Sequence, residues 1–257
     1  MTGLLIKDVM SKTVSISKSA VITEALDKML HEGIDPLVVT NNGTVAGTVT
    51  RKALAEILGK KRNTSISPSQ IHVANAVEED FTSAYPDEEI DVLIPLLQRH
   101  KIVVVLDEEH RLVGHVGAGE LLAIMKPDVA IGDVIETIHP IQTDDRVIHL
   151  RRKMLDEDAT KFIVYENNLP VGIVTETDVA SAMRKFREDV EDKHQKHQIS
   201  NLLVRDIMST PLVSVNENDD INTLINTMLS KRIGAMPVSS GEKIAGVVTR
   251  QGLINML

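Results

Sequence analysis

The chain has no cysteine and no tryptophan, and aromatic side chains make up only 2% of its 257 residues. Without cysteine there can be no disulfide, no thiolate metal site and no cysteine nucleophile. The core must be aliphatic, with ten methionines available to fill gaps. Basic residues are outnumbered, 28 against 37 acidic ones, which gives a net charge of −9. This balance argues against general binding of nucleic acid or of an anionic membrane.

Long apolar runs are also missing. No segment approaches the roughly 18 consecutive apolar residues of a membrane helix. The first ten residues, MTGLLIKDVM, lack the apolar core of a signal peptide. We therefore expect a cytoplasmic protein without a membrane partner. The hydrophobic fraction of 42% and the charged fraction of 25% are those of an ordinary globular chain with one or two domains.

Four imperfect copies of one unit fill the sequence. Each copy opens on a short motif, IKDVM, VANAV, IGDVI or VRDIM, and leads to a glycine at the start of a second motif. The third residues of the openings are Asp8, Asn75, Asp133 and Asp206, and the glycines are Gly47, Gly114, Gly172 and Gly246. The separation is 39 residues in three copies and 40 in the fourth. Such a constant offset is the signature of an internal repeat.

Each copy alternates elements in the same order. A short alternating stretch precedes an apolar helical stripe, then come two apolar strands and a last helix. We therefore predict an α/β (α+β) fold of four β-α-β-β-α units. Pro95 predicts that the second copy starts its helix late or bends it, and we expect the recurring Asp of the openings to act as a cap. The predicted repeats are 4–62, 71–127, 128–188 and 201–257, with a charged linker at 189–200.

The unit resembles the cystathionine-β-synthase-type (CBS) domain. The resemblance lies in the xDVM-like openings, the strand MPV at 236–238 and a Gly-apolar-x-Thr-x-x-Asp motif, which is complete in GIVTETD at 172–178. It covers residues 4–257. It implies that copies pair through their sheets into pseudo-twofold (Bateman) modules and that two modules form a flat disc. It also implies regulatory binding of adenosine-containing ligands, in a layout similar to the nucleotide-sensing subunit of AMP-activated kinase.

The third copy has the best candidate site. If Thr175 ends a strand and Asp178 lies in the first turn of a helix, free N–H groups there favour an anion. An ionised Asp178 can accept both hydrogen bonds of a ribose diol. The resemblance implies that Asp178 binds the ribose, that Thr175 lies near the phosphate and that Thr177 adds a hydroxyl. The alternative is that Thr175 caps the helix and that Asp178 favours its dipole.

The adenine should lie between the first and second strands of the third copy. The candidates are Thr137, Ile138, Pro140, Ile141, Phe162 and Ile163. The other copies depart from the motif, because Ala53 and Gly252 replace the Asp, and the second copy has Gly117 and Glu120. We predict weaker secondary sites there, with Arg51 and Arg250 as candidate phosphate-binding cations. The secondary residues are Thr50, Arg51, Glu120, Thr249 and Arg250.

Two functions follow from these patterns. The first is a regulatory sensor that binds an AMP-, ADP- or ATP-like nucleotide, with or without Mg²⁺, and passes its state to an unknown effector protein. The second is a scaffold or interaction protein with mostly vestigial clefts that acts on a protein or a nucleic-acid-containing partner; the basic KKR at 60–62 is the only hint of an anionic one. An enzyme is the poorest interpretation, because His194 and His197 form only an incomplete metal pair. The chain is expected to be a monomeric disc or a homodimer.

Overall fold

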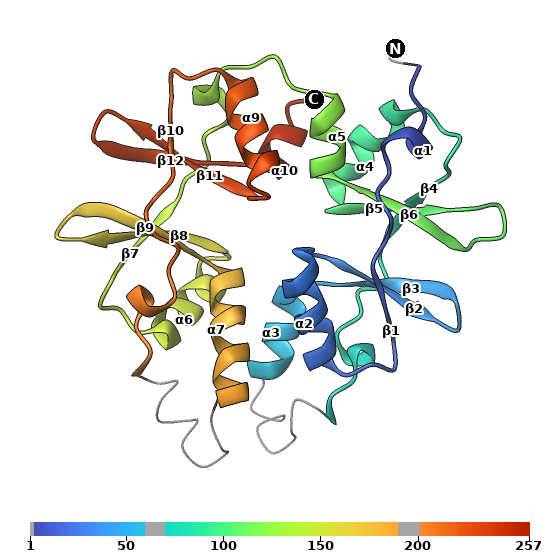
Figure 1. The fold of residues 1–257 in the computed structure, drawn as a ribbon, viewed down its shortest axis with the longest axis horizontal. Helices are drawn as coiled ribbons and strands as arrows, with labels where there is room; N and C mark the ends of the chain where they lie inside the picture. The colour runs from blue at the N-terminus through green and yellow to red at the C-terminus, as the bar shows by residue number, and fades with distance from the viewer. Residues whose placement is uncertain (1–2, 60–69, 190–200) are drawn as a thin grey trace. The chain divides into compact units, whose positions relative to one another are not determined.

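The structure, a computed structural model, describes residues 3–59, 70–189 and 201–257 (Figure 1). Within these residues one topology recurs four times, as four three-stranded sheets with the orders β1-β2-β3, β4-β5-β6, β7-β8-β9 and β10-β11-β12. The α/β fold of four β-α-β-β-α units is confirmed. No helix in the described ranges combines the length and the apolar character that crossing a bilayer requires.

The elements follow the predicted order in each repeat. The first contains α1 (Ile6–Val9), β1 (Ser15–Ser17), α2 (Ile22–Glu32), β2 (Leu37–Asn41), β3 (Thr44–Val49) and α3 (Arg51–Gly59). The second contains η3 (Val73–Asn75), β4 (Thr82–Ala84), η4 (Ile90–Val92), α4 (Leu93–Arg99), β5 (Ile102–Leu106), β6 (Leu112–Gly117) and α5 (Ala118–Ile124). The third contains η5 (Ile131–Val134), β7 (His139–Gln142), α6 (Val147–Asp156), β8 (Lys161–Glu166), β9 (Leu169–Thr175) and α7 (Glu176–Asp189). The fourth contains η6 (Val204–Asp206), β10 (Val215–Asn216), α9 (Ile221–Ser230), β11 (Ala235–Ser240), β12 (Lys243–Thr249) and α10 (Arg250–Ile254).

Local sequence explains where several elements begin. The first helical stripe of the second repeat starts as the 3₁₀ turn η4, and α4 then places Pro95 in its first turn, where its missing N–H is not needed. The predicted late start is therefore confirmed. Asp8 and Asp206 each accept a hydrogen bond of 2.9 Å from the backbone N–H three residues earlier, at Leu5 and Leu203, so their capping role is confirmed as well.

The first strand of each of the first three sheets runs parallel to the second, and the second runs antiparallel to the third. The recurring glycine pairs with Val39, Val105 or Val164, and a register shift follows immediately in each case. The three sheets therefore bend at equivalent positions, next to the glycine.

Two compact units divide the described chain, and they do not follow the repeats. Unit 1 comprises residues 1–129, 220–234 and 249–257, and unit 2 comprises residues 130–219 and 235–248. In unit 1, α9 and α10 of the fourth repeat pack with α4 and α5 of the second (Figure 1). The sheet of the fourth repeat belongs almost entirely to unit 2, with the third repeat.

The openings, which here include the residue that directly follows each five-residue motif, are exchanged between neighbouring repeats. Ser11, in the opening of the first repeat, makes reciprocal backbone hydrogen bonds with His115 in β6 of the second. Glu78, in the opening of the second repeat, pairs in the same way with Thr48 in β3 of the first. In unit 2, Glu136 pairs with Val247, and Ser209 pairs with Ile173. Each opening therefore completes the sheet of its partner, which couples the two repeats of a pair.

The exchange explains the four recurring glycines. A Cβ on Gly47 would lie 2.3 Å from the Glu78 carbonyl oxygen, and one on Gly246 would lie 2.4 Å from that of Glu136. A Cβ on Gly114 would lie 2.7 Å from the sulfur of Met10, and one on Gly172 would lie 2.7 Å from the carbonyl oxygen of Ser209. Only glycine lets the exchanged opening approach so closely. The glycine recurs at a constant offset because each repeat makes this contact at the same position.

The two units contain different kinds of core. In unit 1, Val38 from β2 packs with Val104 and Leu106 from β5. In unit 2, the helix-side face of the third sheet is a core that includes Phe162, Val164 and Val204, the last from the opening of the fourth repeat. The implied pairing of repeats through their sheets is therefore observed in unit 1.

Candidate functional site

The strand–helix junctions, residues 50–53, 117–120, 175–178 and 249–252, hold most of the predicted site residues. At the third junction, β9 becomes α7 between the buried side chains of Val174 and Val179. The backbone N–H and the hydroxyl of Thr175 both donate to Oδ2 of Asp178, at 2.7 and 2.6 Å. This contact caps the helix start, as the alternative interpretation expected. The two capping bonds use only part of the hydrogen-bonding capacity of the Asp178 carboxylate, which has about four acceptor positions.

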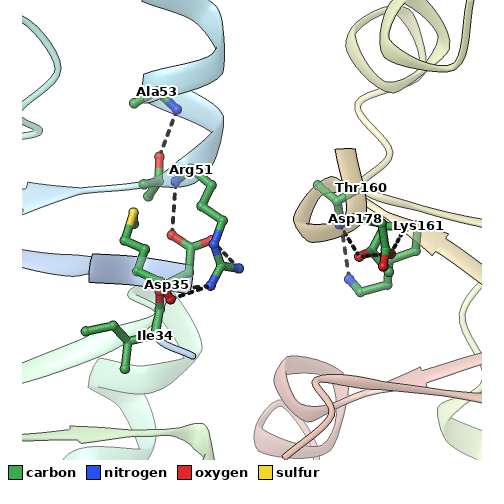
Figure 2. Close-up of polar contacts among 10 residues, drawn as sticks. Ile34, Asp35, Arg51, Ala53, Thr160, Lys161 and Asp178 are labelled. Atoms are coloured by element: carbon green, nitrogen blue, oxygen red, sulfur yellow. Dashed lines mark hydrogen bonds and ion pairs between the residues drawn. The ribbon is translucent and has the colours of Figure 1, made fainter. Parts of the chain in front are cut away.

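The Asp178 carboxylate also contacts the exchanged opening. The Ser209 hydroxyl donates to Oδ1 of Asp178 at 3.1 Å. Thr160 and Lys161, where β8 begins, lie beside Asp178 (Figure 2), and Nζ of Lys161 lies 3.2 Å from Oγ1 of Thr160. The acid therefore has a cation and several hydroxyls around it, which is the chemistry that a phosphorylated sugar needs.

A cavity of about 420 Å³ opens along the sheet face of the same repeat. Its walls are mainly aliphatic, with Thr137 and Tyr165 as the polar members; the lining residues are Ile135, Thr137, Ile138, Pro140, Ile163, Tyr165, Ile244 and Ala245. Ile244 and Ala245 belong to β12, so the fourth repeat supplies part of the wall. An apolar cavity with a few polar groups suits a small organic ligand.

The cavity brings together four of the six residues predicted to hold the adenine, namely Thr137, Ile138, Pro140 and Ile163. Ile141 and Phe162 are only 2% and 0% exposed and pack in the core on the opposite face. Because side chains alternate along a strand, they lie behind the cavity wall rather than in it. The junction residues Thr175, Thr177 and Asp178 do not line the cavity, and Thr177 is exposed on α7.

The first junction receives a carboxylate from its partner repeat. The Thr50 hydroxyl donates to Oε1 of Glu78 at 3.2 Å and accepts the Ala53 N–H at 3.1 Å. Glu78 is fixed there because its backbone pairs with Thr48. The acid that Ala53 lacks is thus supplied by the opening of the second repeat.

Arg51 uses its guanidinium for the fold. Its Nη2 donates to the carbonyl oxygens of Ile34 and Met29 at 3.0 and 3.3 Å, beyond the end of α2 and in its last turn. Its Nη1 lies 4.0 Å from Oδ2 of Asp35, and Oδ1 of Asp35 accepts the backbone N–H of Arg51 at 3.1 Å (Figure 2). A cation at a helix C-terminus neutralises exposed carbonyls and the dipole. The predicted phosphate contact would require these bonds to be exchanged.

The second junction carries its own acid. Oε2 of Glu120 accepts the Gly117 N–H at 3.0 Å, and Oε1 accepts the hydroxyl of Ser11 at 2.8 Å. His115 lies beside them, with Nε2 3.9 Å from Glu120 and Nδ1 3.3 Å from the Thr13 hydroxyl. Burial lowers the pKa of the His115 imidazole, and the Glu120 carboxylate opposes that shift. Glu120 thus repeats the geometry of Asp178, with Ser11 in the place of Ser209.

The fourth junction resembles the first in its arginine. The Thr249 hydroxyl accepts the Gly252 N–H at 2.9 Å and caps α10. Arg250 donates to the Met228 carbonyl oxygen in α9 at 2.8 Å, as Arg51 does to Met29. Burial lowers the pKa of Arg250, while Glu120 raises it. Both arginines therefore anchor the helix of their own repeat.

Sequence reasoning missed Ser209, Ser11, Glu78 and Lys161. The three opening residues are invisible to a repeat-by-repeat analysis, because each acts on the junction of the neighbouring repeat. Lys161 pairs with Thr175 across β8 and β9, so counting strand register back from the motif could have found it.

Metal binding finds no support in the described residues, which contain no group of three or more His, Asp or Glu side chains arranged to hold an ion. The pair His194 and His197 and the basic KKR segment at 60–62 lie outside the described residues.

Comparison with protein families shows that the CBS domain model matches residues 6–60, 123–185 and 204–257, which make up more than half of the chain. The second repeat is matched only at its end, although its sheet has the common topology.

Two curated relatives are uncharacterised archaeal proteins. MJ1404 of Methanocaldococcus jannaschii is 22% identical over 98% of this chain and 61% of its own length. MK0525 of Methanopyrus kandleri is 30% identical over 50% of this chain and 60% of its own length. The chain thus spans about 60% of the length of these relatives.

Two solved structures share the fold over nearly the whole chain. Protein MJ1225 of M. jannaschii, proposed as an archaeal homologue of g-AMPK, superposes with a TM-score of 0.80 at 21% identity, covering 98% of this chain and 99% of its own. An uncharacterised protein from Pyrococcus horikoshii gives a TM-score of 0.63 at 17% identity, with 98% of each chain covered.

Proposed function

Because the chain belongs to the CBS domain family, we propose that it is a regulatory module that binds an adenine nucleotide at the third junction and signals to a partner protein. The observation that best supports this proposal is that an acid, Asp178, and an apolar cavity lie along the same repeat, the third. Asp178 would hold the ribose, and the cavity would hold the base. The proposal assigns the chain no reaction of its own.

The geometry supports a ligand of nucleoside size. Lys161 pairs with Thr175, next to the acid, and Ile163 in the cavity wall lies two residues further along β8. Two residues of a strand span about 7 Å, so the acid and the cavity face are separated by a distance that a nucleoside can bridge. Lys161 and Ile163 also point to the same face, because their positions differ by two.

The phosphate would lie on the acid's side of the site. The cavity lining contains no charged side chain, so a phosphate has no counter-charge within it. Lys161 lies beside Asp178 (Figure 2) and is the candidate phosphate contact. Arg51 and Arg250 stay weaker candidates, because both already donate to helix carbonyls.

Thermal unfolding with AMP, ADP, ATP, MgATP and S-adenosylmethionine tests the proposal. A ligand at 100 times its dissociation constant adds about 2.7 kcal/mol, which for a chain of this size raises the melting temperature by roughly 5–10 °C. Asp178→Asn keeps the shape of the side chain but removes the charge, and it should abolish most of that rise. The matched control is Asp156→Asn, since Asp156 is an exposed acid on α6 that pairs with Arg152.

The two functions predict opposite results. A rise in wild type and in Asp156→Asn that is lost in Asp178→Asn supports nucleotide sensing at the third junction. An equal rise in all three proteins would place the ligand elsewhere. No rise with any nucleotide would reject the proposal and favour the scaffold function, in which a partner binds without a ligand.

A further inference from the structure

The Asp178 carboxylate is largely occupied before any ligand arrives. Oδ2 accepts two hydrogen bonds from Thr175, and Oδ1 accepts one from Ser209. At least three of about four acceptor positions are therefore used. A sugar diol brings two O–H donors, so at least one resident donor must leave when the diol binds.

Ser209 is the donor that is easiest to displace. Its contact with Asp178 is 3.1 Å long and exposed, whereas the Thr175 contacts are 2.7 and 2.6 Å and partly buried. The Thr175 N–H belongs to the capped start of α7, so its loss would also uncap the helix. We propose that a ligand's sugar hydroxyl replaces the Ser209 hydroxyl on Asp178, so that binding at the third repeat loosens the opening of the fourth. This inference rests on the proposed function.

The opening is well placed to carry such a change. Ser209 is held to β9 by reciprocal backbone bonds with Ile173 of 2.8 and 3.1 Å, and Thr210 donates to the Val171 carbonyl oxygen at 3.1 Å. The same segment continues into β10, the first strand of the fourth sheet. The contact of the Ser209 hydroxyl with Asp178 is a further tie of this segment, and a ligand that displaces it shifts the equilibrium of the segment by its difference in affinity for the two states.

The repeats carry an internal correlation that fits this role. The junctions with their own acid, at Asp178 and Glu120, receive a serine hydroxyl from the opening, at 3.1 and 2.8 Å. At Ala53, where the junction has no acid, the opening supplies Glu78 instead. The strand that leads to the fourth junction, which also lacks an acid, pairs with a glutamate of the opening, Glu136. At the first three junctions, opening and junction are therefore matched as donor and acceptor.

Isothermal titration with AMP tests the displacement directly. Ser209→Ala removes the competing donor and should bind AMP about three- to tenfold more tightly than wild type, the scale of one exposed hydrogen bond to a charged acceptor. Thr210→Val is the matched control, because it removes a hydroxyl bond from the same segment to the same strand without touching Asp178. Its affinity should stay within about twofold of wild type.

Amide hydrogen exchange supplies the second measurement. Saturating AMP should speed exchange at the Ser209 and Ile173 amides of wild type severalfold. An excess of inorganic phosphate, added in place of AMP, should leave the exchange rates at their ligand-free values. Slower exchange with AMP, weaker binding by Ser209→Ala, or an equal gain in Thr210→Val would each overturn the displacement while leaving nucleotide binding intact. Absence of AMP binding by wild type would reject AMP as the ligand of the proposed function and, with it, this inference.

Discussion

Replacing Gly246 with alanine should destabilise the protein, because the opening of the third repeat lies directly on this glycine. A Cβ at Gly246 would lie 2.4 Å from the Glu136 carbonyl oxygen and 2.5 Å from Cγ2 of Ile135, whereas real Cβ contacts essentially never fall below 3.0 Å. The nearest atom belongs to the backbone, so a side-chain rotation cannot relieve the clash. The opening must move, and the two hydrogen bonds between Glu136 and Val247, of 2.8 and 3.0 Å, must stretch.

The expected cost follows from these two effects. Overpacking costs about 1–3 kcal/mol, and weakening two backbone hydrogen bonds adds about 1 kcal/mol. For a chain of this length the total of roughly 2–4 kcal/mol lowers the melting temperature by roughly 5–15 °C. Differential scanning calorimetry measures the change. Gly132→Ala is the control, since a Cβ there meets nothing within 4 Å and lies in the same opening. If Gly246→Ala melts like Gly132→Ala, the exchanged opening does not lie where the structure places it.

Three further predictions concern side chains near the junctions. Arg51→Met should lower the free energy of unfolding in urea by about 1–3 kcal/mol, because it leaves the Ile34 carbonyl oxygen without its donor, whereas the Met29 carbonyl oxygen keeps the Ile34 N–H; an unchanged midpoint would contradict the anchoring role. Burial lowers the pKa of His115 below its unfolded value of 6.5, so the unfolded chain takes up the proton first and stability is lost as the pH falls below that value. His115→Gln should therefore lose less unfolding free energy than wild type between about pH 7 and pH 5, and parallel denaturation profiles would refute this. Lys161→Met should weaken AMP binding about fivefold and leave adenosine binding unchanged, which calorimetric titration of both ligands decides.

The repeats could be predicted from the sequence because each element obeys a local rule. Periodic apolar positions such as Ile22, Ala25, Leu26 and Met29 are buried along one face of α2, and Pro95 lies where a helix accepts it. The glycine offset was also visible, although its cause was not. That cause is a contact with another repeat, and no local pattern in the sequence reports which segment lies over a glycine.

The candidate site was predicted less completely, for two physical reasons. The first is strand parity: Ile141 and Phe162 belong to the strands that carry the cavity, but a shift of one residue turns a side chain from the cavity to the core. The second is the exchange of openings, which brings Ser209 to Asp178 across 31 positions of sequence. A motif analysis confined to one repeat could identify the acid but not the hydroxyl that already occupies it.

The exchange also changes how the missing acids should be interpreted. Counting only the junctions, three of four copies have lost the aspartate, and that count favours a scaffold with vestigial clefts. In the structure, however, the second junction holds Glu120 in the geometry of Asp178, and the first receives Glu78 from its partner repeat. An acid on the opening belongs to the neighbouring repeat, whereas an acid on the helix is held by the cap of its own repeat. At Ala53 the acceptor is therefore supplied across the contact between two repeats, which is compatible with regulation and weakens the argument that these junctions are relics.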